Sequence, residues 1–107
     1  MPIIRIDFDN EQITSEDIDR VSHAIRDIVS EVTEIEDVFV YANSSQIKIK
    51  VAPVEIFVEM SAHKIKDLNE LTAQIVERLS KWKTENHFTI SLNLSVIPMP
   101  WKIEIGI

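Results

Sequence analysis

Two proline-led apolar segments, half a chain apart, constrain the fold of this sequence most. Residues 2–8 read PIIRIDF, and residues 53–60 read PVEIFVEM, starting 51 positions later. Runs of β-branched and aromatic residues that alternate in this way are typical of β-strands. Each run leads into a stretch with helical periodicity and then into another apolar run. The sequence therefore predicts a duplicated β-α-β unit.

Two helices are expected after the proline-led segments. The first follows Thr14-Ser15-Glu16-Asp17, where a capping hydroxyl and first-turn acids are typical of a helix N-terminus. The second is expected to begin near Ser61. Each places apolar side chains along one stripe, as a helix that covers a sheet does. The stripes are Ile18, Val21, Ile25, Ile28, Val29 and Val32 in the first helix, and Ile65, Leu68, Thr72, Ile75, Leu79 and Trp82 in the second.

The remaining strands follow from shorter patterns. Residues 38–51 predict a hairpin around the turn signal Asn43-Ser44-Ser45, and its alternating second arm, residues 46–51, turns lysines outward as an edge strand does. Residues 88–97 predict the strand that closes the second unit. It is expected to end at Pro98-Met99-Pro100, because proline cannot donate to a strand ladder.

The C-terminal residues 101–107 alternate once more and carry Trp101, Ile103, Ile105 and Ile107 on one face. A terminal strand with such a face has to bury it. Two arrangements satisfy that need: pairing with a neighbouring subunit, which predicts an oligomer, or an edge strand within the chain's own sheet.

Together these elements predict a single α+β domain over residues 1–107. Unit one covers about residues 2–51, unit two about residues 53–97, and a C-terminal strand follows. The expected architecture is a mixed four-stranded sheet with two helices on one face, plus a short hairpin arm and the C-terminal strand. A ferredoxin-like sandwich gives a similar order of elements and is the alternative.

Composition narrows the functional classes. A net charge of −7 opposes binding to phosphate backbones, so no nucleic acid partner is expected. No apolar run reaches the roughly 18 residues of a membrane span, and no basic-then-apolar leader is present, so a cytoplasmic location is expected. The chain has no cysteine, its single glycine cannot build a phosphate-binding loop, and its three histidines lack metal-ligand spacing. We therefore expect no metal and no cofactor.

The Met-Pro start, the alternating first strand and the two β-α-β units resemble the tautomerase superfamily. That group includes 4-oxalocrotonate tautomerase, 5-carboxymethyl-2-hydroxymuconate isomerase and macrophage migration inhibitory factor. The resemblance extends from Pro2 to about Ile97. Val54-Glu55-Ile56-Phe57-Val58 looks most similar to a poorly characterised bacterial branch with two β-α-β units per chain.

The resemblance implies a catalytic role for Pro2. In this family the initiator methionine is removed and the secondary amine of the proline acts as general base in keto–enol proton transfer on a small organic acid. It also implies a homotrimer with sites at subunit boundaries. An α-amino group has a pKa near 7.7–8.0, and burial lowers that pKa, so a neutral amine is available near neutral pH. Without the family role, Pro2 simply starts a strand.

Two departures from the family pattern leave the question of enzyme or non-enzyme open. Family members that act on dicarboxylates carry arginines where this chain has Ile13 and Phe39. A retained Met1 would convert the Pro2 nitrogen into an amide without basicity. The alternative is a non-catalytic oligomeric module of the same fold.

Two further residues are candidates for substrate binding. Arg5 is three residues from Pro2 and suits an anionic substrate, but a pairing with Asp7 or Glu55 explains it equally. Tyr41 suits a hydrogen bond to a developing enolate, or a strand end with its hydroxyl in water. The basic turn of His63, Lys64 and Lys66 is interpreted as solvated, with an anion site as the other interpretation.

Overall fold

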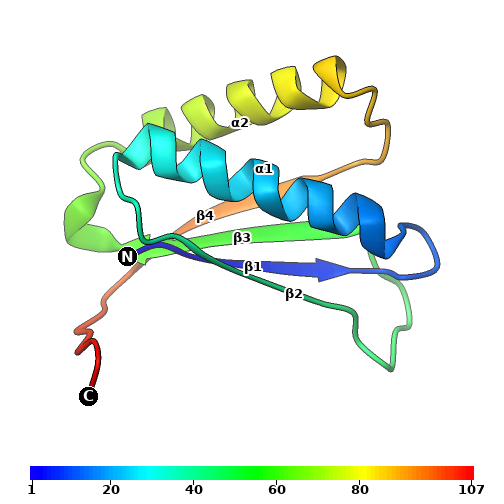
Figure 1. Cartoon of the computed structure of the whole chain (residues 1–107). Helices are drawn as coiled ribbons and strands as arrows, with labels where there is room; N and C mark the ends of the chain where they lie inside the picture. Colours follow the sequence, from blue (N-terminus) through cyan, green and yellow to red (C-terminus); the bar gives the residue numbers. More distant parts are fainter.

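The two proline-led segments become the two central strands of one sheet (Figure 1). The computed structural model describes residues 1–107. In chain order its elements are β1 (Ile3–Phe8), α1 (Ser15–Thr33), β2 (Phe39–Asn43), β3 (Val54–Ser61), the 3-10 turn η1 (Ala62–Lys64), α2 (Leu68–Glu85) and β4 (Asn93–Met99).

Strand pairing confirms the duplicated unit. The sheet order is β2-β1-β3-β4, in which β1 pairs with β2 in parallel and β3 pairs with β4 in parallel. β1 and β3 meet antiparallel at the centre, with Ile6 opposite Ile56. Each helix connects the two parallel strands of its own unit, and both helices lie on the same face of the sheet (Figure 1). The predicted α+β class and mixed four-stranded sheet are therefore confirmed.

The core lies between the sheet and the helices. Ile4 and Ile6 of β1 are completely buried, as are Ile56 and Val58 of β3. They pack with the apolar stripes of α1 and α2, including the fully buried Ile25 and Ile75. Burying each such side chain contributes about 1.5–3 kcal/mol. The opposite face of the sheet carries no helix and is called the open face below.

The predicted hairpin over residues 38–51 is wrong. Its first arm is β2, which pairs with β1 in the parallel sense, but residues 46–51 form no strand. The physical reason is a side chain at the centre of that segment. Lys48 Nζ bonds to Asp9 Oδ1 and Asn10 Oδ1, each at 2.9 Å, so the segment is drawn to the loop after β1 instead of running along β2.

Boundaries in unit two also differ from expectation. A 3-10 turn and a short extended segment precede α2, which begins at Leu68 because the Asp67 carboxylate caps it. β4 starts at Asn93, and it continues through Pro98 to Met99. Pro98 does not break the strand because β4 lies at the edge of the sheet, where a missing N–H is tolerated.

The C-terminal segment forms no strand within the chain, which corrects the expectation of a C-terminal strand in its own sheet. In Figure 1 the chain leaves β4 and descends on the side of the sheet away from the helices. Ile105 and Ile107 are exposed to 74 % and 107 %. Neither helix combines the length and the hydropathy needed to cross a membrane.

Candidate functional site

Pro2 lies at the start of the central strand β1, with its side chain less than 2 % exposed. Its carbonyl accepts a hydrogen bond of 3.2 Å from the backbone N–H of Phe39. The antiparallel register pairs Ile3 with Glu59, so Met60 of β3 is the next residue across from Pro2. Cα atoms of such opposite residues lie about 4.5–5.5 Å apart. Pro2 therefore sits against Met60 on the helix-covered face of the sheet.

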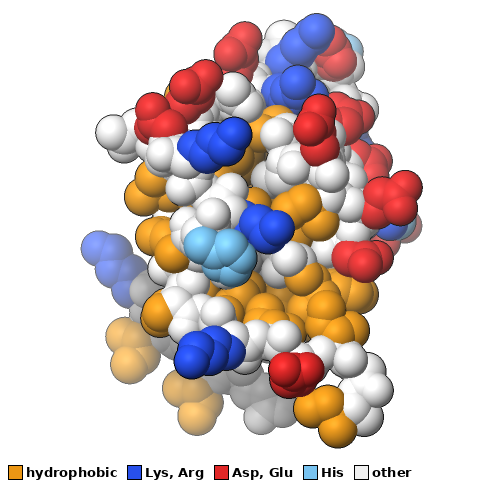
Figure 2. Space-filling view, turned by 90° about the vertical axis from the view of Figure 1, so that its left-hand side faces the viewer, with side chains coloured by type: hydrophobic (Ala, Val, Ile, Leu, Met, Phe, Trp, Pro, Cys, Tyr) orange, Lys and Arg blue, Asp and Glu red, His pale blue; other side chains and the backbone are white.

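A pocket of about 490 Å³ opens at this end of the molecule. Four segments contribute to it: the C-terminal end of α1 with the residues just after it, the buried Met60 of β3, the connection between η1 and α2, and the first turns of α2. Figure 2 looks at this end and shows basic side chains beside exposed hydrophobic ones. The lining residues are Val32, Thr33, Ile35, Met60, Lys64, Ile65, Lys66, Asp67, Glu70, Leu71 and Gln74.

The pocket lining is mixed: five of its eleven residues are apolar and four are charged. Met60, which is only 3 % exposed, belongs both to the pocket lining and to the position across from Pro2. Sequence reasoning missed Met60 and the α1 residues, because their meeting depends on how α1 and β3 end beside each other. The only available signal was the similarity between residues 2–8 and residues 53–60. If the two strands pair antiparallel, the end of β3 lies near the start of β1.

Arg5 and Tyr41 are brought together by the sheet, but on the open face. They are register partners in β1 and β2, and Tyr41 is 56 % exposed. The Arg5 guanidinium stacks over Phe57 at 5.0 Å, and its Nε lies 3.4 Å from Glu59 Oε1. The carboxylate beside Arg5 is thus Glu59, not Asp7 or Glu55. Within one chain, both residues are separated from the Pro2 ring by the thickness of the sheet.

The positions where family arginines are expected offer no anion-binding group. Ile13 is 4 % exposed and belongs to the hydrophobic core. Phe39 lies on the open face opposite Ile3 and is 44 % exposed. Neither position can therefore hold a carboxylate.

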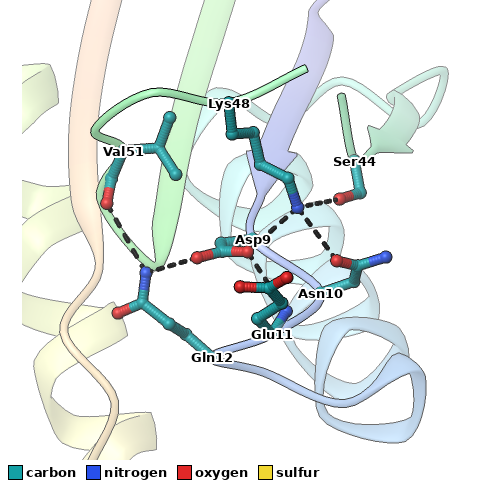
Figure 3. Close-up of polar contacts among 7 residues, drawn as sticks. All are labelled: Asp9, Asn10, Glu11, Gln12, Ser44, Lys48 and Val51. Atoms are coloured by element: carbon teal, nitrogen blue, oxygen red, sulfur yellow. Dashed lines mark hydrogen bonds and ion pairs between the residues drawn. The ribbon is translucent and has the colours of Figure 1, made fainter. Parts of the chain in front are cut away.

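The other end of β1 holds a polar cluster built around Asp9 (Figure 3). The Asp9 carboxylate accepts hydrogen bonds from Gln12 Nε2 at 2.6 Å, Lys48 Nζ at 2.9 Å and the backbone N–H of Glu11 at 3.1 Å. These donors, led by Gln12, lower the pKa of Asp9 to about 2. The cluster joins the loop after β1 to residues 44–51, and sequence reasoning missed it.

No group of three histidine or acidic side chains is placed to hold a metal ion. One further polar pair lies next to the pocket, where Ser61 Oγ and His63 Nδ1 are 2.7 Å apart. Ser61 is 8 % exposed, so this hydrogen bond satisfies a buried hydroxyl at the start of η1.

No protein-family model and no curated protein matches the sequence. Several solved structures share the fold. Malonate semialdehyde decarboxylase superposes with a TM-score of 0.70 at 10 % identity, over 97 % of this chain and 92 % of that chain. A macrophage migration inhibitory factor-like protein from Entamoeba histolytica gives 0.64 at 18 % identity, over 96 % and 95 %. A fused 4-OT, an asymmetric trimer, gives 0.63 at 9 % identity, over 91 % and 85 %. The fold is tautomerase-like.

Proposed function

We propose that this chain, whose fold is tautomerase-like, transfers a proton between the keto and enol forms of a small organic acid, with Pro2 as general base after removal of Met1. The observation that carries the proposal is the position of Pro2. It is completely buried at the start of the central strand, across from Met60 of the 490 Å³ pocket.

The chemistry follows from the environment of that nitrogen. A free prolyl amine next to Met60 and beneath the helices would be partly desolvated, which disfavours its charged form and lowers its pKa below the usual 7.7–8.0. A base with a pKa near the working pH is the most effective proton acceptor. Met60 links the position of Pro2 to the pocket, and the apolar residues of the lining would contact the carbon that gains or loses the proton.

One structural neighbour adds support. Malonate semialdehyde decarboxylase has been solved both as wild type and with the proline at its own first position changed to alanine, in a study of its decarboxylase and hydratase activities. An N-terminal proline is thus a site of interest in a protein with this fold.

The test starts with an intact mass of untagged protein, which must be short by one methionine. Phenylenolpyruvate or a 2-hydroxydienoate then serves as substrate. We expect Pro2→Ala to lower turnover by roughly 10²–10⁴-fold, the usual contribution of a general base. Pro53→Ala, at the equivalent position of the second unit, is the matched control and should keep wild-type turnover. Wild-type turnover in Pro2→Ala, or in protein that retains Met1, would reject the proposal.

The second candidate is a non-catalytic oligomeric module. The buried Ile13 and the open-face Phe39 favour it, because neither replaces the arginines of family members that act on dicarboxylates. Absence of turnover on every enol tested, in protein whose mass shows a free Pro2, would select this alternative.

Both candidates include assembly of several copies in the cytoplasm, with a trimer favoured by the trimeric state of the fused 4-OT. Assembly also bears on Arg5 and Tyr41. Since they lie across the sheet from Pro2 in one chain, their proposed roles in substrate binding apply at a boundary between copies. Arg5→Ala should then raise KM for an anionic substrate only in the assembled protein.

A further inference from the structure

We propose that Lys48 is a latch that selects between two conformations of residues 44–51, a segment called the strap below. In the latched conformation, which is the one in the structure, the strap lies against the loop after β1 (Figure 3). In the unlatched conformation the strap pairs with the outer edge of β2 and adds a fifth strand to the sheet. The latch therefore decides whether this edge is open to another strand or covered by the chain itself.

The strap is attached to the body of the chain by side-chain contacts alone. No backbone N–H or C=O of residues 44–51 bonds to another backbone group. Lys48 Nζ makes three hydrogen bonds, to Asp9 Oδ1 at 2.9 Å, Asn10 Oδ1 at 2.9 Å and Ser44 Oγ at 3.2 Å. The only other hydrogen bond of the strap is a long one of 3.5 Å, from Gln12 Nε2 to the Val51 carbonyl. Loss of a single ammonium group would thus release most of the strap.

The charge of Asp9 explains why the latched conformation is the stable one in the wild-type chain. Asp9 is nearly buried, and Lys48 is its only cationic partner. An unlatched wild-type chain would leave this carboxylate without a cation, which is strongly unfavourable. When Lys48 is replaced by an uncharged residue, neither conformation pairs the carboxylate with a cation. The electrostatic preference for the latched conformation then disappears.

The outer edge of β2 has free backbone groups for the strap. β2 is an edge strand, and its Phe39 N–H donates to the Pro2 carbonyl on the side of β1. Because successive backbone N–H groups of a strand point to opposite edges, those of Val40 and Ala42 point away from β1. No other strand lies on that side.

The sequence of the strap fits this edge. A four-residue loop over residues 43–46 would place Ile47 opposite Ala42 and Ile49 opposite Val40, and each of these pairs would exchange backbone hydrogen bonds. Both isoleucines are almost fully exposed in the latched conformation. In the unlatched one they would lie on the helix-covered side of the sheet, where Val40 already packs against the core. Apolar burial and new backbone hydrogen bonds therefore favour the unlatched conformation once the latch is removed.

Hydrogen exchange of individual amides, followed by NMR, tests the latch. In the wild type, the amides of residues 46–50 should exchange as in an unstructured peptide, because they have no backbone partner. In Lys48→Met, the amides of Ile47 and Ile49 should exchange more than about 10-fold more slowly, whereas those of residues 48 and 50 should remain fast. Lys50→Met is the matched control. It removes the same charge from the same strap, and because Lys50 forms no ion pair, its exchange should match the wild type.

A second variant tests the register of the new strand. Ile49→Pro, added to Lys48→Met, removes the N–H that would pair with Val40. It should return the Ile47 amide to fast exchange. The protection in Lys48→Met should also be independent of protein concentration, because the partner is β2 of the same chain.

Four results would overturn the proposal. The first is fast exchange of Ile47 and Ile49 in Lys48→Met, and the second is equal protection in Lys50→Met. The third is protection that survives Ile49→Pro or disappears on dilution, since dilution dependence would indicate pairing with another copy. The fourth is loss of protection at Ile6 and Ile56 in Lys48→Met. These amides lie in the central strands, so their loss would mean that Lys48 holds the whole fold together and not the strap alone.

Discussion

Asp9 is a nearly buried carboxylate whose charge is compensated entirely within the chain. It is 7 % exposed and accepts hydrogen bonds from Gln12, Lys48 and the Glu11 backbone. These contacts lower its pKa from 3.8 to about 2. Because the folded-state pKa lies below the unfolded value, the ionised carboxylate stabilises the fold above about pH 4. That contribution is lost as the pH falls through the interval from about 4 to 2.

The Asp9→Asn variant tests this linkage. It should unfold at a lower urea concentration than wild type at pH 7, since the amide cannot accept the same charge-assisted bonds. Its stability should then change less than that of wild type between pH 4 and pH 2. Asp7→Asn, on the exposed part of β1, is the control and should follow the wild-type curve. Parallel stability curves for Asp9→Asn and wild type would show that the cluster contributes no pH dependence.

Single residues differ in how far the sequence reveals them. The burial of Ile4 and Ile6 follows from alternation along β1, and so does the exposure of Arg5 on the other face. The partner of Asp9 does not follow from any local pattern, because Lys48 is 39 positions away and the contact depends on the path of a loop. In the sequence, Lys64 and Lys66 are interpreted as part of a solvated turn. They border a pocket because the ends of α1 and β3 lie beside this turn, and no local pattern predicts that meeting.

At the scale of elements, the helix N-termini are set by side-chain caps. Thr14 Oγ1 accepts the Asp17 N–H at 3.2 Å at the start of α1, as the Thr-Ser-Glu-Asp pattern predicts. Thr14→Ala should lower the free energy of unfolding by about 1 kcal/mol, whereas Thr14→Ser keeps the hydroxyl and should stay close to wild type. Urea titrations of the three proteins measure the difference. Equal losses in both variants would mean that the threonine methyl group, not the cap, is responsible.

The strands show which element-level predictions depend on tertiary context. Alternation correctly located β1, β2 and β3, and it equally predicted a strand over residues 46–51 that does not form. The segment could either run along β2 or turn toward the loop after β1. The Lys48–Asp9 contact belongs to the second arrangement, which is the one observed. Pro98 was expected to end a strand, but the consequence of a proline depends on whether its strand is central or at the edge.

At the scale of the whole molecule, apolar side chains remain exposed away from the helices. Phe39 and Tyr41 lie on the open face, and residues 47 and 49 of the connection to β3 are isoleucines exposed to 87 % and 99 %. The C-terminal segment adds Ile105 and Ile107. Large exposed apolar surfaces on soluble proteins mark sites of association. The duplicated sheet was predicted from alternation. For residues 101–107 alternation left two arrangements open, a neighbouring subunit or an edge strand in the chain's own sheet, and the second does not form.

Removal of the apolar side chains from the C-terminal segment tests assembly. In the proposed oligomer, Ile103 and Ile105 are buried against a neighbouring copy, and burial of each contributes about 1.5–3 kcal/mol. Replacing both by serine should therefore weaken association by more than about 100-fold and shift the mass in light scattering toward one chain of 12.3 kDa. Replacing Lys102 and Glu104 by serine changes the alternate face and should preserve the oligomer. The fold itself should survive in both variants, because residues 101–107 belong to neither a helix nor a strand of their own chain. Two results would contradict a role of the C-terminal segment in assembly. One is a wild-type protein that is monomeric at all concentrations, and the other is an oligomer that persists after loss of the isoleucines.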